Sequence, residues 1–424
     1  MIRIFKKYNE NEIFSRALET FDVSSTVREI IANVKNNGDS ALKFYSSKFD
    51  KVDLDSFEIN PEAMKDAYNR VDENFKAVLD EAADNIREYH KEQTRTGYEI
   101  NRDNGVIIGR KVLPLERVAL YVPGGTAAYP SSVLMNCIPA KIAGVDEIIM
   151  TTPPSKDGSI SDDILAAAYV AGVDRLFCIG GAQAIAALAF GTESVPKVDK
   201  IVGPGNAFVA EAKRQVYGIV DIDMIAGPSE ILIVADKTAD PRAVAADMLS
   251  QAEHDKNASA VLITDSIELA DLTAVELERQ LDLLPRKEIA RSSIDNNGKI
   301  IIADNIQTAI DISNRLAPEH LEINTEDAMS YLPLVRNAGS VFIGANCPEA
   351  VGDYFSGTNH VLPTSGTARF ASALSVDDFI KTIEYTYYPS NAMQHDADKI
   401  ALFARREGLD AHAKSALIRK EINK

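Results

Sequence analysis

The segment Ala317-Pro318-Glu319-His320 carries the sharpest local chemical signal in the sequence. An adjacent Glu-His pair follows a turn-forming proline, and these two residue types are the usual general acids and bases of enzymes. A second interpretation is a helix that begins here, because an acidic first turn interacts favourably with the helix dipole. The segment alone leaves both interpretations open.

Other side chains offer ligands for a metal ion. Gln251 and His254 stand three positions apart near the end of a predicted helix, so both point to one face. Asp353 lies in a glycine-punctuated loop, and His412 lies on a predicted C-terminal helix. One amide, one carboxylate and two imidazoles form a mixed nitrogen and oxygen set that suits zinc. The spacing is not His-Glu-x-x-His, so ordinary hydrogen-bonded histidines remain the alternative.

Three further histidines complete the set of six. His360 shares the glycine-punctuated loop with Asp353, which makes it a second candidate for a functional site. His90 and His395 lie in polar stretches with helix or loop character, which predicts surface positions for both.

Four turns rich in glycine punctuate the middle of the chain. They are Val122-Pro123-Gly124-Gly125, Gly180-Gly181-Ala182-Gln183, Gly203-Pro204-Gly205-Asn206 and Gly227-Pro228-Ser229-Glu230. The first three follow a predicted strand and precede a helix, where a ligand meets bare backbone N–H groups and a helix N-terminus. Each alone is more often a simple tight turn, but three at successive strand ends predict a nucleotide or anion site. The G-x-G-x-x-G fingerprint and the Walker lysine loop are both absent.

The elements that must position these residues alternate between strand and helix. Buried strands are predicted at 118–122, 147–151, 175–179, 200–202, 231–235 and 260–263, and helices at 133–143, 162–171, 182–190 and 207–217. This alternation predicts an α/β fold with parallel sheets covered on both faces. The first third is helical, with a helix from Ser24 or Ser25 to about Gly38 and another that opens at Asn60-Pro61.

These patterns predict four parts of the chain. Residues 1–20 form an N-terminal arm, residues 21–118 and 231–375 one discontinuous α/β domain, residues 119–230 a compact α/β unit, and residues 376–424 a helical tail. The discontinuous domain rests on the expectation that the helical first third packs with the second strand series. The tail is too short and too charged to hold its own core, so we expect it to dock, for example on a second copy of the chain.

Composition excludes several classes of protein. The chain has 424 residues, 46% hydrophobic and 25% charged, with a net charge of −18, which argues against disorder and against nucleic acid as a partner. Three scattered cysteines, Cys137, Cys178 and Cys347, predict neither a disulfide framework nor a zinc ribbon. Neither a signal peptide nor an apolar stretch long enough for a membrane is visible, so we expect the cytoplasm and no membrane partner.

Taken together, eight segments resemble the histidinol dehydrogenase family in the family's order over nearly the whole chain. They are Tyr121-Val-Pro-Gly-Gly125, Gly180-Gly-Ala-Gln-Ala-Ile185, Val202-Gly-Pro-Gly-Asn206, Ile225-Ala-Gly-Pro-Ser-Glu230, Ser250-Gln-Ala-Glu-His254, Leu316-Ala-Pro-Glu-His-Leu321, Val351-Gly-Asp-Tyr354 onward to Asn359-His360, and Glu407-Gly-Leu-Asp-Ala-His412. The resemblance implies two incomplete Rossmann-like units, of which residues 119–230 bind NAD. It also implies oxidation of L-histidinol to L-histidine through an aldehyde with two NAD⁺, the last step of histidine biosynthesis.

The resemblance assigns roles to individual positions. Glu319 and His320 match the catalytic pair, and the match to one zinc ion per subunit falls on Gln251, His254, Asp353 and His412. Substrate contacts fall on these four ligands, on His320, and on Ser229, His360 and Glu407. NAD contacts fall on Tyr121, Gln183 and Asn206. The family is a homodimer, so the resemblance implies sites completed by the partner's C-terminal tail.

Three other functions remain to be weighed. A related zinc- and NAD-dependent dehydrogenase would oxidise another primary alcohol. A zinc hydrolase would use Glu319 to activate water but has no use for three glycine-rich strand ends. A non-catalytic binding protein has little reason to keep a Glu-His pair.

Overall fold

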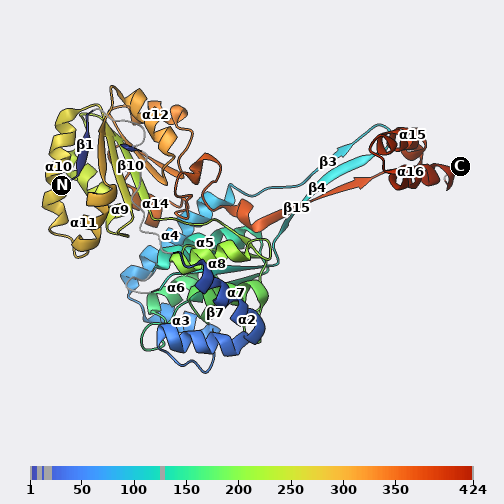
Figure 1. Ribbon diagram of the computed structural model, residues 1–424, viewed down its shortest axis with the longest axis horizontal. Helices are drawn as coiled ribbons and strands as arrows, with labels where there is room; N and C mark the ends of the chain where they lie inside the picture. The colour runs from blue at the N-terminus through green and yellow to red at the C-terminus, as the bar shows by residue number, and fades with distance from the viewer. Residues whose placement is uncertain (1, 7–11, 14–21, 125–128, 423–424) are drawn as a thin grey trace. The chain divides into compact units, whose positions relative to one another are not determined.

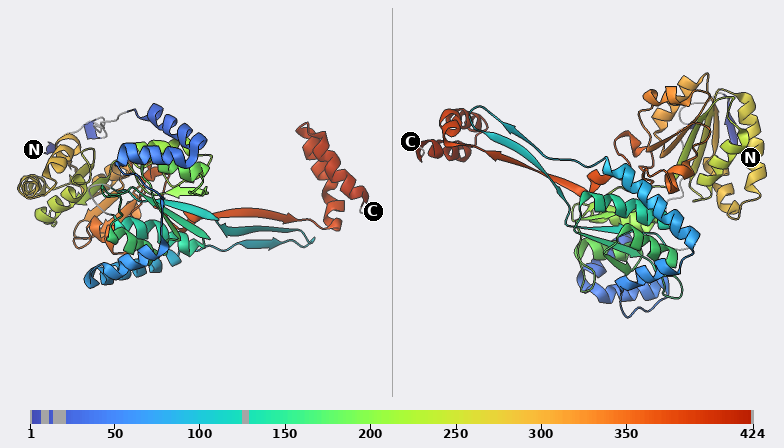
Figure 2. Two further views of the ribbon diagram at one scale, coloured as in Figure 1. Left: turned by 90° about the horizontal axis from the view of Figure 1, so that it is seen from below. Right: turned by 180° about the vertical axis from the view of Figure 1, so that it is seen from behind.

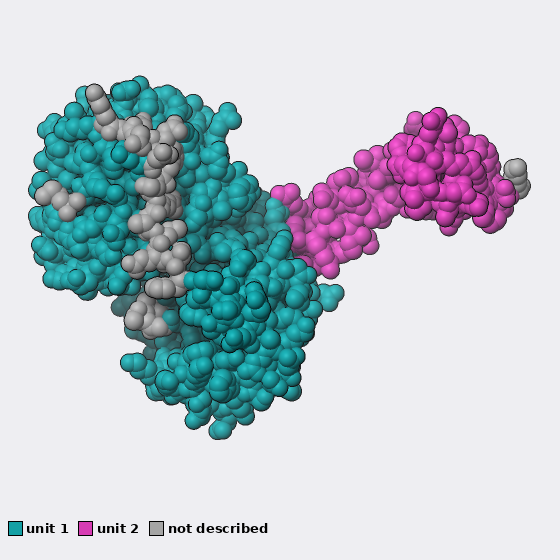
Figure 3. Space-filling model, in the orientation of Figure 1, with its two compact units in different colours: residues 1–93, 116–379 teal, residues 94–115, 380–424 magenta. Residues whose placement is uncertain are grey.

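The computed structural model describes residues 2–6, 12–13, 22–124 and 129–422. The chain forms two compact units, residues 1–93 with 116–379 and residues 94–115 with 380–424, which are called unit 1 and unit 2 below (Figure 3). Most of the expected N-terminal arm, residues 1–20, lies outside the described residues, and so does Gly125 of the first glycine-rich turn.

Unit 1 contains two six-stranded sheets. The first has the spatial order β2 (Glu58–Ile59), β7 (Arg175–Cys178), β6 (Glu147–Thr152), β5 (Arg117–Tyr121), β8 (Lys200–Val202) and β9 (Asp221–Ile222). All pairs are parallel except β2 with β7. From the central strand β5 the chain winds first to one side and then to the other, so the strand order reverses between β5 and β8. Such a switch point is where open α/β sheets bind ligands.

Helices cover both faces of the first sheet (Figure 1). One layer contains α2 (Ser24–Tyr45), α7 (Gly181–Phe190) and α8 (Ala207–Val216), and the other contains α3 (Pro61–Arg70), α4 (Glu73–Lys91), α5 (Pro130–Ala143) and α6 (Asp162–Ala171). Helix α3 starts as predicted, with the Asn60 side chain accepting from the Glu62 N–H and proline in the first turn. Helix α2 does not end at Gly38: it kinks there and continues to Tyr45.

The N-terminal helices pack against the first sheet, and the prediction that they pack with the second strand series is wrong. Val27, Ile30 and Val34 of α2 share one apolar core with α7 and with the first sheet. Helix α3 packs on α6, and α4 packs on α5. The short strand β1 (Arg3–Phe5) joins the second sheet beside β12, and Ile2 and Ile13 pack in the cores on its two faces. An amphipathic pattern shows that a helix has an apolar face, but not which partner covers that face.

The second sheet is parallel throughout. Its spatial order is β1, β12 (Lys299–Ile302), β11 (Ser259–Thr264), β10 (Glu230–Ala235), β13 (His320–Asn324) and β14 (Ser340–Ile343). Two separate apolar cores lie on its faces. One holds α9 (Pro241–Ala252), α10 (Ile267–Leu281) and α11 (Lys287–Asn297), and the other α12 (Ile306–Leu316) and α13 (Ala328–Tyr331); the short helix α14 (Glu349–Tyr354) follows β14.

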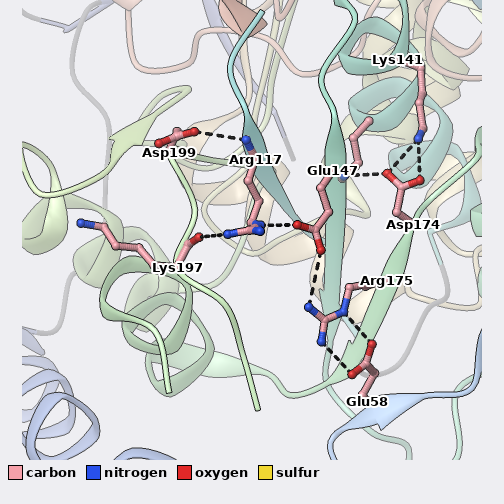
Figure 4. A network of polar contacts seen from close by, with 9 residues as sticks. Glu58, Arg117, Lys141, Glu147, Asp174, Arg175, Lys197 and Asp199 are labelled. Carbon is pink, nitrogen blue, oxygen red and sulfur yellow. Dashed lines mark hydrogen bonds and ion pairs between the residues drawn. The ribbon is translucent and has the colours of Figure 1, made fainter. Parts of the chain in front are cut away.

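Charged side chains tie the first sheet together at the edge where its parallel strands begin (Figure 4). Arg175 makes two hydrogen bonds to the carboxylate of Glu58, at 2.7 and 2.8 Å, and lies 3.5 Å from Glu147. Glu147 also pairs with Arg117, whose backbone N–H donates to Asp199. The network bridges β2, β7, β6, β5 and the residue before β8, which leaves the opposite edge of the sheet for ligands.

Unit 2 is a three-stranded antiparallel sheet followed by two helices. The spatial order is β15 (Ile380–Tyr387), β4 (Ile107–Pro114) and β3 (Tyr98–Asn101), and α15 (Ser390–Arg406) packs against α16 (Asp410–Ile422) (Figure 2). The helix pair buries little: its core contains Ala401, Ala404 and Ala413, with Leu417 packed against them.

The predicted fold class, an α/β fold with two Rossmann-like parallel sheets, is confirmed. Each strand and helix predicted between residues 118 and 263 is present, with ends shifted by at most three residues. None of the helices in the described part of the chain is long and apolar enough to cross a membrane.

Candidate active site

A cavity of about 970 Å³ lies in unit 1 where opposite edges of the two sheets come together. The first sheet contributes residues that follow its strands: Pro123 after β5, and Pro204 to Asn206 after β8. The second sheet contributes residues that precede or begin its strands: Ser229 before β10, and Glu319 with His320 at the start of β13. The volume falls in the range of ligand pockets in proteins, which is about 300–1,000 Å³.

The Glu319-His320 pair lies in the wall of this cavity. Helix α12 ends at Ala317, which has a left-handed backbone, and His320 begins the buried strand β13. The alternative of a helix that begins at Glu319 is therefore wrong. Both side chains are buried, with Glu319 7% and His320 4% exposed, yet both line the cavity.

Hydrogen bonds fix the orientation of both members of the pair. The Glu319 Oε2 accepts from the backbone N–H of Glu230 at 2.8 Å. The His320 Nδ1 lies 3.0 Å from the carbonyl oxygen of Glu230, which can only accept, so Nδ1 carries a hydrogen. The opposite nitrogen, Nε2, lies 3.5 Å from the Asp353 carboxylate and makes no hydrogen bond to any described residue. A lone pair on Nε2 is the arrangement that a general base requires.

Electrostatic effects in the pair oppose one another. Burial raises the pKa of Glu319 to about 8, although the nearby His320 opposes this rise. Burial lowers the pKa of His320, but the carboxylates of Glu319, Asp353 and Glu349 outweigh burial and raise it to about 10. The neighbouring carboxylates thus make the His320 imidazole a strong proton acceptor, and burial favours the neutral carboxyl form of Glu319.

Three of the four predicted zinc ligands surround the same part of the cavity. Gln251 lies in the last turn of α9, His254 two residues beyond it, and Asp353 in α14, and all three line the cavity. The Oε1 atom of Gln251 is buried and has no hydrogen-bond partner in the described residues. Burial lowers the pKa of His254, which favours the neutral imidazole that binds metals.

These residues suit an ion that takes one amide oxygen, one carboxylate and one imidazole. No group of three or more His, Cys, Asp or Glu side chains forms a metal cage within the residues that the structure describes. Gln251, His254 and Asp353 are therefore three candidate ligands in unit 1, of which two belong to those residue types.

The fourth predicted ligand, His412, belongs to unit 2. It lies in α16, and Glu407 lies at the end of α15. Both side chains are exposed on the surface of that unit. Of the predicted ligands, three therefore lie on unit 1 and His412 lies on unit 2.

The predicted NAD residues differ in their positions. Asn206 is exposed in the cavity wall, and its Oδ1 accepts from the backbone N–H groups of Phe208 and Val209 at the start of α8. Tyr121 is buried, and its hydroxyl accepts from the backbone N–H of Gly181. Gln183 is buried under the same turn and does not line the cavity. Of the three predicted NAD residues, Asn206 therefore lines the cavity, whereas Tyr121 and Gln183 are buried behind its wall.

A buried ion pair supports the Asn206 turn. Lys213, on α8, donates to the carbonyl oxygen of Gly203 at 2.9 Å and pairs with Asp223. Asp223 accepts from the backbone N–H of Gly203 at 2.7 Å. Gly203 has φ +108°, and a Cβ there would lie 2.2 Å from the carbonyl oxygen of Tyr121. The turn can therefore hold only glycine at this position.

His360 lines the cavity, and its Nε2 lies 3.4 Å from the hydroxyl of Ser132 at the start of α5. The preceding residue, Asn359, is buried and donates to the carbonyl oxygen of Met135. It also lies 3.5 Å from His90, whose Nδ1 bonds Gln93. His90 is fully buried, so the prediction that it lies on the surface is wrong, whereas His395 is exposed as predicted.

Two carboxyl groups of the site escaped sequence analysis. Glu349 accepts from Ser250 and from Gln251, and Glu230 accepts from the backbone N–H of Ser365. Glu230 follows Ser229 in one of the four glycine-rich turns, so the sequence pattern had marked its segment but not its side chain. Glu349 follows Cys347-Pro348 with no distinctive pattern, and only the fold brings it under Gln251.

The chain matches the model of the family described as histidinol dehydrogenase over residues 15–420. Histidinol dehydrogenase from Clostridium acetobutylicum is 54% identical over 414 residues, which cover 98% of this chain and 96% of that protein. The protein of the same name from Streptococcus mutans is 54% identical over 405 residues, which cover 96% of this chain and 94% of that one.

A solved structure gives the same result. The crystal structure of histidinol dehydrogenase from Elizabethkingia anophelis superposes with a TM-score of 0.94 at 38% identity, and the match covers 100% of this chain and 99% of that one. The match extends over both units and over the cavity with its Glu-His pair, and the chain belongs to the histidinol dehydrogenase family.

Proposed function

We propose that this chain oxidises L-histidinol to L-histidine through L-histidinal, with two NAD⁺ as hydride acceptors. The observation that carries the proposal is the buried Glu319-His320 pair in the wall of a cavity that also reaches the α8 N-terminus. Family membership favours this reaction over a zinc hydrolase, which needs no dinucleotide. The reaction is the last step of histidine biosynthesis, and we expect it in the cytoplasm.

The first oxidation removes one hydride and one proton from the primary alcohol. His320 accepts the hydroxyl proton at Nε2, while the hydride passes from the carbon to the nicotinamide. The hydrogen bond between His320 Nδ1 and the Glu230 carbonyl oxygen holds the ring and stabilises the imidazolium that forms. The product is histidinal, with one NADH.

The second oxidation requires water. Glu319 removes a proton from a water molecule as its oxygen attacks the aldehyde, which gives a gem-diol. His320 again takes a hydroxyl proton, and the second hydride passes to a second NAD⁺. Carboxylate, a second NADH and the released protons complete the balance. The buried position of Glu319 raises its basicity, as this step needs.

We assign one zinc ion per subunit to Gln251, His254, Asp353 and His412. Support comes from the unpartnered Oε1 of Gln251 and from the mixed nitrogen and oxygen donor set. When bound, zinc would hold the amine and the imidazole of histidinol and neutralise part of the surrounding negative charge. Ser229, His360 and Glu407 would add polar contacts to this cationic substrate.

We place NAD along the turns of the first sheet. Backbone N–H groups after β8 and the N-terminus of α8, which has ten residues, favour the negative charge of a pyrophosphate. The cavity continues along α8 to Glu211 and Arg214, which provides length for a dinucleotide. In this arrangement Asn206 contacts the cofactor directly, and Tyr121 and Gln183 hold the turn beneath it.

We propose a homodimer in which the α15–α16 pair of each chain completes the site of its partner. The pair exposes several large apolar side chains, and such a surface indicates an interaction site. Their exposed fractions are 43–76% for Leu402, Phe403, Leu409, Ile418 and Ile422. It also carries the exposed Glu407 and His412, which the unit 1 cavity lacks.

The stoichiometry of NADH tests the reaction. We expect two NADH for each histidinol consumed and little free histidinal. One NADH with accumulation of histidinal would contradict the role given to Glu319. A panel of other primary alcohols separates the related dehydrogenases, because faster turnover of another alcohol would exclude histidinol as the preferred substrate.

Mixing two inactive variants tests the shared site. His320→Ala and His412→Ala are refolded together, so that about half of the dimers are mixed. With shared sites, each mixed dimer has one intact site, and activity returns to about one quarter of the wild-type value. No recovery despite demonstrated subunit exchange would show that each tail serves its own chain.

A further inference from the structure

Glu349 occupies an unusual position behind the candidate metal site. Its side chain is only 3% exposed and does not line the cavity, so it cannot touch substrate. Its Oε1 accepts from the Ser250 hydroxyl at 2.5 Å, and its Oε2 accepts from the Gln251 amide nitrogen at 2.6 Å. Neither acid–base step above uses this group.

The contact with Glu349 determines which end of the Gln251 amide faces the cavity. A carboxylate only accepts hydrogen bonds, so it must receive the NH₂ end of an amide. If the amide were turned over, two oxygen atoms would face each other at 2.6 Å. Because Nε2 faces Glu349, Oε1 points away from it, and this oxygen is the atom without a partner.

A second neighbour favours the opposite orientation, but more weakly. The Gln251 Nε2 also lies 3.1 Å from His320 Nδ1, and both nitrogens carry hydrogen, so neither accepts from the other. The Nδ1 hydrogen is already donated to the Glu230 carbonyl oxygen at 3.0 Å, so it does not require the amide oxygen. The Glu349 contact is shorter, at 2.6 Å, and hydrogen bonds to an ionised carboxylate are about twice as strong as neutral ones.

Only the oxygen of an amide binds a cation well, because the nitrogen lone pair is delocalised into the carbonyl group. We infer that Glu349 is a positioning residue that holds the Gln251 amide with its oxygen toward the metal. The inference rests on the zinc site proposed above. Groups that orient a metal ligand in this way commonly contribute about 10- to 100-fold to metal affinity.

Zinc affinity of the full-length metal-free protein tests the inference, measured by competition with a chromophoric chelator at about pH 8. Glu349→Gln keeps the size of the side chain but offers both a donor and an acceptor, so either orientation of Gln251 is satisfied. We expect zinc affinity to fall about 10-fold or more. When Co²⁺ replaces zinc, the ligand-field absorption bands of Glu349→Gln should differ in position from those of the wild type.

A double-mutant cycle separates positioning from a general structural effect. In a Gln251→Ala background, Glu349→Gln should cause no further loss, because the oriented ligand is gone. Glu322→Gln is the matched control: Glu322 is equally buried and accepts from the Glu349 backbone N–H, but it does not contact Gln251. Its zinc affinity should match the wild type.

The outcomes distinguish this inference from the proposed function. A wild-type protein that binds no zinc would overturn both. Zinc binding that is equal in the wild type and Glu349→Gln, or an equal loss with and without Gln251, would overturn the inference alone. If Glu349→Gln does not fold, Glu349→Asp replaces it. That change withdraws the carboxylate by one methylene, and unchanged zinc affinity would then reject the positioning role.

Discussion

Replacing Glu319 by Gln should separate the two halves of the reaction. The substitution keeps the shape of the side chain, and the new amide oxygen can accept the Glu230 N–H that Glu319 Oε2 accepts at 2.8 Å. The fold of the β13 start is therefore retained. What disappears is the ability to take a proton from water, which only the oxidation of histidinal requires.

The expected loss follows from this single function. A positioned general base commonly contributes 10²- to 10⁴-fold, or about 3–5 kcal/mol of activation free energy. We expect kcat for histidinal to fall by at least about 100-fold. Oxidation of histidinol to histidinal should fall by less than about 10-fold, since His320 still accepts the alcohol proton.

The same substitution should move the pH profile of the first oxidation. The Glu319 carboxylate lies 3.7 Å from His320 Nδ1 and raises the pKa of that imidazole. Removing its charge lowers the pKa of His320, so the neutral base is present at lower pH. The rising limb of the rate profile should shift toward lower pH.

The rates of the two oxidations are measured from the pre-steady-state absorbance of NADH. Histidinol and histidinal are used as substrates in separate experiments. The variant should give a rapid first NADH, a slow second one, and histidinal that a carbonyl reagent can trap. Thermal unfolding controls for misfolding. Equal losses in the two halves, or an unshifted pH profile, would refute the division of labour between Glu319 and His320.

Three further predictions concern stability and metal. Lys213→Met leaves the Asp223 carboxylate buried without its partner, because both side chains of this pair are at most 2% exposed. Denaturant unfolding should show that the free energy of unfolding falls by about 3–5 kcal/mol. As a control, Arg242→Met breaks the exposed pair with Asp240 and should lower the free energy of unfolding by less than about 1 kcal/mol. Burial raises the pKa of Asp50 to about 6, so the folded state holds this proton more tightly than the unfolded state. Stability of the wild type relative to Asp50→Asn should therefore fall by about 1–2 kcal/mol between pH 4 and pH 7, and a constant difference would contradict this. Removing metal with a chelator should abolish activity but preserve the circular dichroism spectrum, because α9, which carries Gln251, packs in an apolar core of the second sheet. Loss of most of the helical signal would show a structural metal.

Local sequence patterns were enough to predict where the strands and helices lie. The runs of the first sheet, such as Ile148 to Met150, are apolar at every position because both faces are covered, and their ends are marked by glycine or proline. The start of α3 at Asn60-Pro61 was equally readable, because a cap and its proline act within one turn. These signals depend only on neighbours in the chain.

Packing partners were not readable in this way. The apolar stripe of α2 fits either sheet equally well, and only the fold shows that it joins α7. His90 looks like a polar helix residue, yet Gln93 and Asn359 satisfy its ring nitrogens in the interior. Long-range partners of single polar residues leave no periodic trace in one sequence.

The location of the Glu319-His320 pair shows the same limit and bears on the chemistry proposed for it. The first sheet uses its carboxyl edge, as open α/β sheets do, but Glu319 and His320 stand at the amino edge of the second sheet. There β13 pairs with β10 and β14 on both sides, and His320 lies opposite Ile231 and Ser340.

A residue held between two strands has little freedom, so in the proposed reaction the Nε2 of His320 would keep one direction through both oxidations. A loop would allow the ring to turn between the two steps, whereas one fixed base can serve two successive hydride transfers from the same carbon. In the first sheet, Gly203 lets the turn after β8 approach the Tyr121 carbonyl oxygen closely, and the buried Lys213 and Asp223 side chains hold that turn in place. In the proposed reaction, the amino edge of the second sheet holds the substrate through both steps, and the carboxyl edge of the first sheet receives each dinucleotide in turn.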